Sequence, residues 1–238
     1  MIEASPAFQP VQRTTVVEDI IGQIRDLMRG NRYAPGSKLP SERDLARRLK
    51  VSRPSVREAL RTLTHMGVLD TRHGSGSQVA GSGKKVLKAP LQFLLMLDQP
   101  SIADIHETRE VIDIFLAGCA AKRRTDADLE AMEAPLAELK VSMRRKKGVT
   151  DPDFRFHQAL WTAAHHPILA RFMACMQENV HALIDSVQPS VHDYRASYEI
   201  HERIFTSLRR RNAPQARRAM QVHHDMMTDE LREAKLLP

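Results

Sequence analysis

Apolar residues recur at helical spacing through the first third of the chain. Three short segments, at residues 17–28, 41–49 and 52–66, carry apolar residues three or four positions apart, which is typical of amphipathic helices. Ser41 and Ser52 stand at the start of the second and third segments, where an N-cap is expected. The pattern therefore predicts three helices, the last two joined by a tight turn.

Two short extended segments follow these helices, at residues 68–72 and 77–80. The sequence between them, His73-Gly74-Ser75-Gly76, is rich in glycine, as the tip of a β-hairpin often is. Such a hairpin behind three helices would form a wing. The next residues, 82–90, have the composition of a linker.

The rest of the chain has helical spacing only. Breaks near Pro100, Pro167, Pro189 and Asn212 divide it into six or seven helices, and no strand pattern competes. The predicted fold class is mainly α, with a winged helix-turn-helix (three helices plus a β-hairpin wing) followed by an all-α bundle. The expected divisions are a flexible tail at 1–13, a winged helix-turn-helix domain at 14–81, a linker at 82–90 and an all-helical domain at 91–238.

Positive charge is concentrated at the front of the chain. Residues 1–81 contain 13 Lys and Arg against 8 Asp and Glu, whereas residues 91–238 contain 20 against 21. The formal net charge of +7 therefore belongs to the first domain and the linker. A basic domain joined to a nearly neutral one indicates that only the first binds a polyanion.

Other bulk features favour a cytoplasmic protein. No apolar run approaches the roughly 20 residues that span a bilayer, and the first residues lack the pattern of a secretion signal. We therefore expect no membrane association. Cys119 and Cys175 lie far apart without metal-site spacing, so we expect both to be small buried groups in a reduced setting.

The second and third segments have the layout of a helix-turn-helix, in which the start of the second helix meets base edges in the major groove of DNA. The apolar spacing leaves Arg43, Arg53, Ser55 and Arg57 on exposed sides of these helices. Arginine can bond O6 and N7 of guanine together, and the helix N-terminus at Ser52 suits a phosphate. The alternative for each arginine is a solvated position or a local ion pair.

The bundle contains a possible metal site. Asp153 and His157 are one helical turn apart, and His201 and His223 lie in later helices that could face inward. One carboxylate and three imidazoles suit a divalent ion, with Zn²⁺ the first candidate and Ni²⁺ or Mn²⁺ as alternatives. The spacing alone leaves a surface ion pair between the first two open. It also leaves other histidines as rival ligands, namely His165, His166, His181, His192 and His224.

The first domain resembles a known family through "LPSERDLA", "VSRPSVREAL" and a Gly-x-Gly wing. These motifs are similar to the winged-helix DNA-binding domain of the GntR family of bacterial transcription regulators, over about residues 17–79. The resemblance implies that a double-stranded operator is bound, as a short palindrome, by a homodimer. It also implies these operator contacts: Arg43, Ser52, Arg53, Pro54, Ser55, Arg57, His73 and Gly74.

Residues 91–234 resemble the ligand-binding domain of the FadR subfamily of that family, the FCD type. The matching segments are "ADIHETREVID", "DPDFRFHQALWTAAHHP" and "IHERIFTSLRRRNAPQARRAMQVHH". The resemblance implies a metal held by Asp153, His157, His201 and His223. It also implies that Arg109 meets the carboxylate of an effector; the alternative for Arg109 is a salt bridge to Asp113.

This chain departs from the family pattern at three places. It has His166 before Pro167, where Asn is frequent, Asp113 where Glu is frequent, and Ile200 in place of a Glu before His201. The departures leave the four metal positions unchanged but put the size and identity of the effector in doubt.

The sequence thus predicts a ligand-responsive bacterial transcription regulator, a repressor in its usual mode, rather than an enzyme. Its effector would be a small organic acid bound at the metal. Two alternatives remain: a metal-dependent hydrolase that uses the Asp/His₃ cluster, and a constitutive DNA-binding dimer without an effector.

Overall fold

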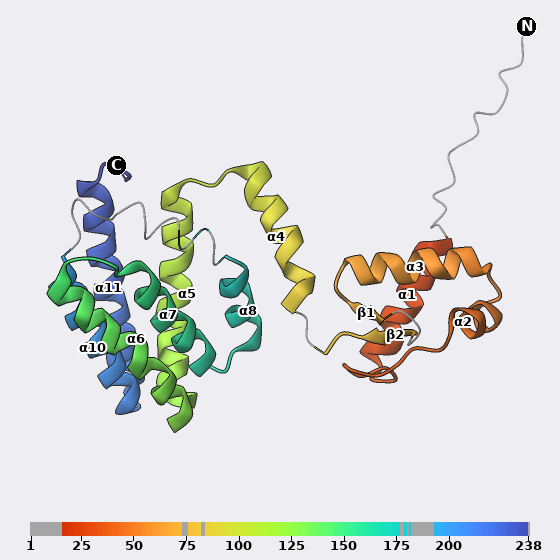
Figure 1. The fold of residues 1–238 in the computed structure, drawn as a ribbon, viewed down its shortest axis with the longest axis horizontal. Helices are drawn as coiled ribbons and strands as arrows, with labels where there is room; N and C mark the ends of the chain where they lie inside the picture. Colours follow the sequence, from red (N-terminus) through yellow and green to blue (C-terminus); the bar gives the residue numbers. More distant parts are fainter. Residues whose placement is uncertain are drawn as a thin grey trace, which may run out of the picture. The chain divides into compact units, whose positions relative to one another are not determined.

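The computed structural model describes residues 16–72, 76–81, 84–176, 179, 181 and 193–237 (Figure 1). The chain forms two compact units, Met1–Ala89 and Pro90–Pro238, called here the N-terminal unit and the C-terminal unit. Within the described residues, no helix has both the length and the apolar character needed to cross a membrane.

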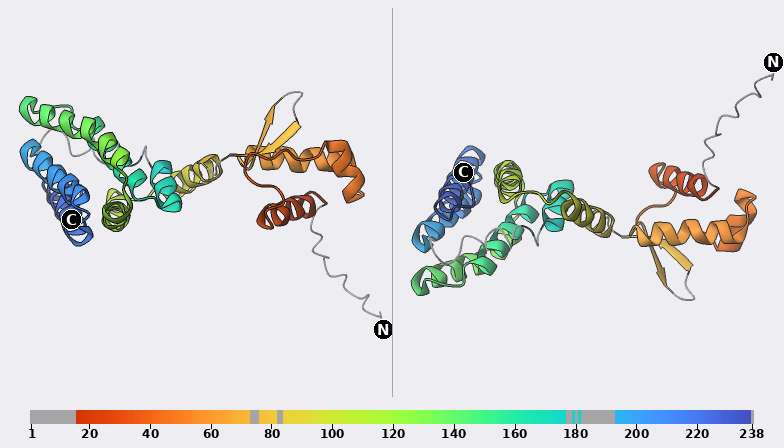
Figure 2. Two further views of the ribbon diagram at one scale, coloured as in Figure 1. Left: turned by 90° about the horizontal axis from the view of Figure 1, so that it is seen from below. Right: turned by 90° about the horizontal axis from the view of Figure 1, so that it is seen from above.

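The N-terminal unit is a winged helix-turn-helix, as predicted. It contains α1 (Val16–Arg29), α2 (Glu42–Leu49), α3 (Arg53–His65), β1 (Leu69–Arg72) and β2 (Gly76–Val79). The strands pair antiparallel, with Leu69 opposite Val79 and Arg72 opposite Gly76. Figure 2 shows α1 and the hairpin on opposite sides of α3. Two expected operator contacts, His73 and Gly74, lie outside the described residues.

The predicted N-caps lie at the starts of the two helices of the helix-turn-helix. The Ser41 hydroxyl accepts a hydrogen bond from the backbone N–H of Asp44, and Ser52 does the same for Ser55 at the start of α3. Lys50 ends α2 with a left-handed backbone (φ 54°), which turns the chain sharply between the helices. One core holds the unit together, built from Ile20, Ile24, Leu39, Leu45, Ala46, Val56, Ala59, Leu60, Leu63, Leu69 and Val79.

The hairpin has a third neighbour that the sequence pattern did not reveal. The Leu39 N–H donates to the Ser77 carbonyl, and the Val79 N–H donates to the Ser37 carbonyl, both at 2.9 Å. Lys38 thus forms a bridge with Gln78. The segment before α2 is therefore tied to the wing by backbone hydrogen bonds.

The C-terminal unit is all-helical in its described part. Its helices are α4 (Lys84–Asp98), which begins in the N-terminal unit, α5 (Ile102–Arg123), α6 (Asp126–Arg145), α7 (Thr150–Ala163), α8 (Pro167–Cys175), α10 (Tyr194–Arg209) and α11 (Ala213–Glu233). Residues 84–90 of the segment expected as a linker are helical, because Lys, Leu and Ala favour a helix and the ring of Pro90 interrupts it only locally. Breaks fall near Pro100 and at Asn212, as predicted.

The bundle is organised around α5, which packs against α7, α8, α10 and α11. Its apolar core includes Leu116, Phe156, Trp161, Ile204 and Met220, and it also contains the buried side chains of Cys119 and Cys175, as expected. The bundle also buries an unusual number of polar side chains on these helices: His106, Arg109, Asp113, Asp153, His157, His201, His223 and His224. Because buried charged groups require partners, this set is the natural place to look for a binding site.

Candidate DNA-recognition helix and metal centre

The start of α3 presents its polar residues to solvent. Arg53 and Pro54 are exposed, and Ser52 Oγ lies 2.8 Å from Ser55 Oγ, so the two hydroxyls are joined at the helix N-terminus. Arg43 on α2 is exposed as well. In the described part of the chain neither Arg43 nor Arg53 forms an ion pair, so both guanidinium groups are available to DNA.

Arg57 differs from Arg43 and Arg53 because it has a protein partner. Its Nη2 donates to Oε2 of Glu42 at 3.0 Å, and its Nε donates to the same oxygen at 3.1 Å. This hydrogen bond lowers the pKa of Glu42, so the pair is fully ionised at neutral pH. The contact joins α2 to α3 and fixes the direction of the Arg57 side chain, which is predicted to contact the operator.

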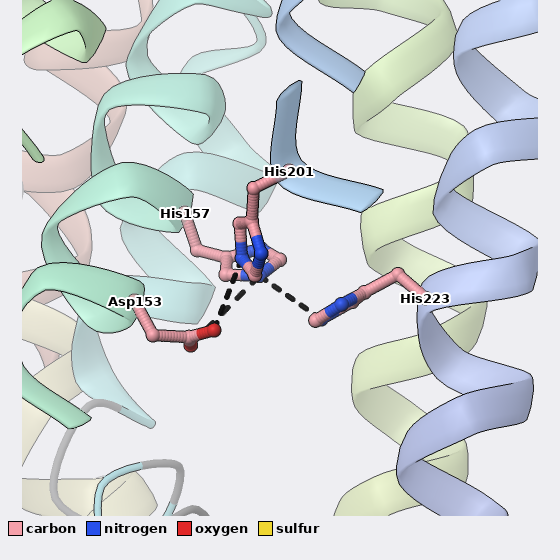
Figure 3. Close-up of side chains that lie close together, drawn as sticks. All are labelled: Asp153, His157, His201 and His223. Carbon is pink, nitrogen blue, oxygen red and sulfur yellow. Dashed lines mark hydrogen bonds and ion pairs between the residues drawn. The ribbon is translucent and has the colours of Figure 1, made fainter. Parts of the chain in front are cut away.

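In the C-terminal unit, four predicted metal ligands converge from three helices. Asp153 and His157 come from α7, His201 from α10 and His223 from α11, and Figure 3 shows their side chains pointing toward one another. One ligand atom from each lies within 4.8 Å of the others, and all four residues are buried. Metal–nitrogen and metal–oxygen bonds of about 2.0–2.2 Å place ligand atoms roughly 3–4 Å apart, so the group needs only a small contraction to hold an ion.

The ligand atoms of the cluster lie at contact distance from one another, yet several of them lack a hydrogen-bond partner. His157 Nε2 lies 3.1 Å from His223 Nε2, and His201 Nε2 lies 3.0 Å from Asp153 Oδ1 without hydrogen-bond geometry. Asp153 Oδ2 and His201 Nε2 have no hydrogen-bond partner. Buried polar atoms in native proteins are nearly always paired, so these orphaned atoms fit a bound cation.

Neighbouring polar groups face the Nδ1 atoms of two of the imidazoles. His201 Nδ1 lies 2.7 Å from the Ser197 carbonyl, and since only the ring nitrogen can donate, Nδ1 carries the proton and Nε2 is left as a lone-pair donor to a metal. His157 Nδ1 faces Asp113 Oδ2 at 3.6 Å. His157 Nδ1 makes no hydrogen bond at this distance, but a carboxylate beside the second ring nitrogen is common for a metal-ligating histidine.

Burial keeps two of the cluster histidines, His157 and His223, neutral, as metal binding requires. Desolvation, aided by the charge of Arg109, lowers the pKa of His157 to about 3, and desolvation also lowers the pKa of His223 well below its usual value. Burial alone would raise the pKa of Asp153, but His157, His201 and Arg109 outweigh it and lower the pKa of this carboxyl. At neutral pH His157 and His223 are thus neutral imidazoles and Asp153 is a carboxylate.

Arg109 on α5 forms the salt bridge that the sequence left open as its alternative role. Its Nε donates to Asp113 Oδ2 at 3.1 Å, which is the salt bridge to Asp113. Its Nη2 lies 3.7 Å from Asp153 Oδ2, but Nη1 and Nη2 make no hydrogen bond. Only 1% of its surface is exposed, so two donor groups remain unused in the interior next to the metal ligands.

The rival histidines that the structure describes are occupied elsewhere, with one exception. His165 pairs with Asp128 at 2.8 Å, His166 accepts from the Leu169 N–H at the start of α8, and His181 packs on the Phe154 ring. His192 lies outside the described residues. The exception is His224, which is fully buried and lies 3.3 Å from Asp113 Oδ2.

Sequence reasoning did not recognise a second polar group beside the ligands. It consists of His106, Asp113 and His224, with Trp161 Nε1 donating to Asp113. The signal was present: His106, Arg109 and Asp113 are spaced three and four apart, which places them on one face of a helix. The pairing with His224 on α11 needed the fold.

Comparison with known proteins agrees with both units. Residues 16–79 match the family described as "Bacterial regulatory proteins, gntR family", and residues 104–226 match the FCD domain. The chain is similar to the HTH-type transcriptional regulator LutR of Bacillus subtilis, with 30% identity over 86% of this chain and 96% of that protein. It is also similar to the HTH-type transcriptional repressor NanR of Edwardsiella tarda, with 30% identity over 90% of this chain and 85% of that protein.

Among solved structures, GntR of Streptococcus agalactiae is similar, with a TM-score of 0.68, 26% identity and coverage of 90% of this chain and 98% of that one. A helix-turn-helix with a wing, followed by a helical sensor domain, defines a bacterial transcription regulator. The chain belongs to the GntR family and carries an FCD domain. This family membership identifies the protein as a transcription regulator. The Asp/His₃ cluster alone had left a metal-dependent hydrolase open as an alternative.

Proposed function

We propose that this protein is a metal-dependent, effector-controlled repressor. Its DNA-binding domain would be residues 14–81, and its sensor domain residues 91–238. A dimer would bind a palindromic operator in the bacterial cytoplasm, and a small organic acid in the C-terminal unit would weaken that binding. The observation that carries the proposal is the pair of unused Arg109 donors beside four convergent metal ligands, because such a site needs both a cation and an anion.

DNA recognition is assigned to the N-terminal part of α3. Arg53, Ser55 and Arg57 would meet base edges, Arg43 would contact the neighbouring groove, and Ser52 with Pro54 would place the helix N-terminus at a phosphate. His73 and Gly74 would bring the wing to the DNA backbone. The exposure of the arginines supports this assignment.

The cofactor is a divalent ion, with Zn²⁺ first among Zn²⁺, Ni²⁺ and Mn²⁺. Asp153, His157, His201 and His223 would hold it, and when bound it would supply a positive charge and an acceptor site for a carboxylate. Each of the four residues would supply one donor atom to the ion, and the carboxylate of the effector would add a further one. Arg109 would bind the same effector carboxylate on the side opposite the metal ion.

Homodimer formation is assigned to α4. Leu91 and Leu95 on one side of this helix pack into the bundle core. The other side exposes large apolar residues, including Phe93 at 61% and Leu97 at 74%. Because DNA palindromes require two-fold symmetry, a second copy of the chain is the occupant we assign to this face.

A substitution pair tests the dimer. Leu97→Glu should convert dimers to monomers in analytical ultracentrifugation and reduce operator affinity. Val141→Glu on α6, which alters an equally apolar but unrelated exposed position, should do neither. A dimer that persists in the first variant would contradict the assignment.

The function as a whole is tested with genomic fragments, metal analysis and a ligand screen. We expect selective binding of one operator, about one divalent ion per chain, and a rise in the unfolding temperature with selected carboxylic acids that chelator abolishes. The same acids should release the operator. Operator affinity that no acid changes would instead favour a constitutive DNA-binding dimer.

A further inference from the structure

Two histidines outside the metal cluster lie side by side in the core of the bundle. His106 on α5 and His224 on α11 have ring centroids 5.5 Å apart and are 2% and 0% exposed. The His224 ring is also 5.2 Å from that of His223. The pair therefore borders the metal ligands without belonging to them.

Most polar atoms of this pair are unsatisfied. His106 Nδ1 and both ring nitrogens of His224 have no hydrogen-bond partner, like Nη1 and Nη2 of Arg109. Unpaired buried polar groups are costly and rare in native proteins. Five such nitrogens in one region indicate a polar occupant larger than the metal ion itself.

The hydrogen bonds around Thr228 identify what His106 needs. The Thr228 hydroxyl donates to the His224 carbonyl at 2.9 Å, so its only proton is used there. His106 Nε2, 2.8 Å from the same hydroxyl oxygen, must then be the donor. A neutral imidazole has one N–H, and burial lowers the pKa of His106 to about 4. His106 Nδ1 is therefore an acceptor that requires a donor from the occupant.

The charges of the site limit the occupant further. The buried ionised groups here are Arg109, Asp113 and Asp153, which together carry one negative charge. A divalent cation changes this to one positive charge. Because an unbalanced charge in a protein interior is costly, an occupant with a single negative charge fits best.

We propose that His106 and His224 form a second effector subsite that binds a hydroxyl group of a small hydroxy-monocarboxylate, whose carboxylate lies between Arg109 and the metal. This inference rests on the proposed function and specifies its effector class. A hydroxyl donates to His106 Nδ1 and can still accept from a neighbour, whereas a keto oxygen only accepts. An ammonium group would donate too, but it would face the positive charges of Arg109 and the metal.

The test is calorimetric titration of the metal-loaded, full-length protein with matched acids. The probes are lactate, pyruvate, propionate and malonate, and the four-carbon series of 2-hydroxybutyrate, 3-hydroxybutyrate, 2-oxobutyrate, butyrate and succinate. We expect at least one hydroxy acid to bind roughly tenfold more tightly than its deoxy and keto analogues, as loss of one buried hydrogen bond predicts. The dicarboxylates should bind more weakly than that hydroxy acid.

Substitution then assigns the preference to the histidines. His106→Phe should reduce the hydroxy-to-deoxy ratio to near one and leave the affinity for the deoxy acid and the metal content unchanged. His224→Leu should do the same, and it provides a second measurement if the first variant does not fold. Equal binding of hydroxy and deoxy acids, or a ratio retained in both variants, would overturn the subsite alone, while absence of binding by any acid would overturn the proposed function as well.

Discussion

The Arg57 guanidinium on α3 is held by the Glu42 carboxylate on α2, with Nη2 and Oε2 3.0 Å apart. The pair is about half exposed, so its contribution to stability is small. Its geometric effect is larger, because a two-point contact fixes the direction of a long side chain before DNA arrives. An arginine that would otherwise sample many rotamers is thereby preorganised.

The first prediction concerns this preorganisation. Glu42→Gln should lower the ratio of specific to non-specific DNA affinity by about tenfold, within the roughly 1–3 kcal/mol of a good base contact. Specific binding should fall because Arg57 is released, whereas non-specific binding should rise because a negative charge is lost. Fluorescence anisotropy with operator and random duplexes measures both.

The control for Glu42 is Glu58 on α3. Glu58→Gln removes the same charge from an exposed position on α3 and leaves the Glu42–Arg57 pair intact. It should raise both affinities together. If both variants behave alike, the effect is only electrostatic and Glu42 does not position Arg57.

The second prediction separates two roles of Ser52, which caps α3 and stands where a phosphate is expected. Ser52→Ala should destabilise the N-terminal unit by about 1 kcal/mol. Ser52→Asp should keep the cap and hence the stability, but it should weaken operator binding because aspartate repels phosphate. Differential scanning calorimetry and DNA titration distinguish these outcomes.

A cap in the other unit serves as the reference for Ser52. Thr125→Ala removes the capping box of α6 and should lower stability by a similar amount without an effect on DNA affinity. If the Ser52→Asp variant binds the operator with the affinity of the parent protein, a phosphate at this helix N-terminus is excluded.

The fold of the N-terminal unit could be predicted well, because the sequence signals that determine it lie within a few residues of one another. Ser41, Ser52 and the apolar spacing of the helices determine caps and faces within a few residues, and the structure follows them. The strand-like pairing of residues 37–39 with β2 was missed, since a three-residue segment has no periodicity to detect. The helix at 84–90 shows a further limit: linker composition and helix composition overlap when lysine and alanine dominate.

The candidate metal site was predictable for a different reason. Spacing and the apolar helix pattern suggested Asp153, His157, His201 and His223 with other histidines as rivals, and the resemblance to a family selected these four. The second polar group could not be predicted, because whether His106 meets His224 depends on how α5 packs along α11. Long-range packing of this kind leaves no local signature in a single sequence.

The third prediction concerns the metal ligands. His157→Ala combined with His201→Ala should abolish tight metal binding, measured by elemental analysis after gel filtration. Metal should raise the unfolding temperature of the parent but not of this variant, since only a ligand of the native state stabilises it. The control is His65→Ala, at an exposed position in the N-terminal unit, which should retain metal. Full metal content in the double variant would contradict the assignment of the metal ligands.

The fourth prediction concerns Arg109 and Asp113, a buried ion pair. Arg109→Ala should lower the free energy of unfolding by about 3–5 kcal/mol, because it leaves a buried carboxylate without its partner. Arg109→Leu with Asp113→Asn should recover most of this loss, since Asn can still accept from Trp161. Urea denaturation measures the difference.

Effector binding distinguishes stability from function in the same variants. The double variant should fold and bind operator with the affinity of the parent, yet it should not respond to any acid. A double variant that still responds would show that Arg109 is a structural residue and not a carboxylate ligand.

The last prediction is the acid sensitivity of the metal-free protein. In the folded state burial lowers the pKa of His106 to about 4, and the usual value in an unfolded chain is about 6.5. Between these values the unfolded state binds more protons, so the free energy of unfolding must fall as the pH falls. The contribution of His106 is complete above pH 6.5 and decreases by about 2 kcal/mol on acidification from pH 7.5 to 5.

Urea denaturation in chelator across this range should show the decline. His106→Gln should make it shallower by about that amount, whereas His65→Gln should not, and an identical slope in the His106 variant would mean that His106 is not held neutral in the core.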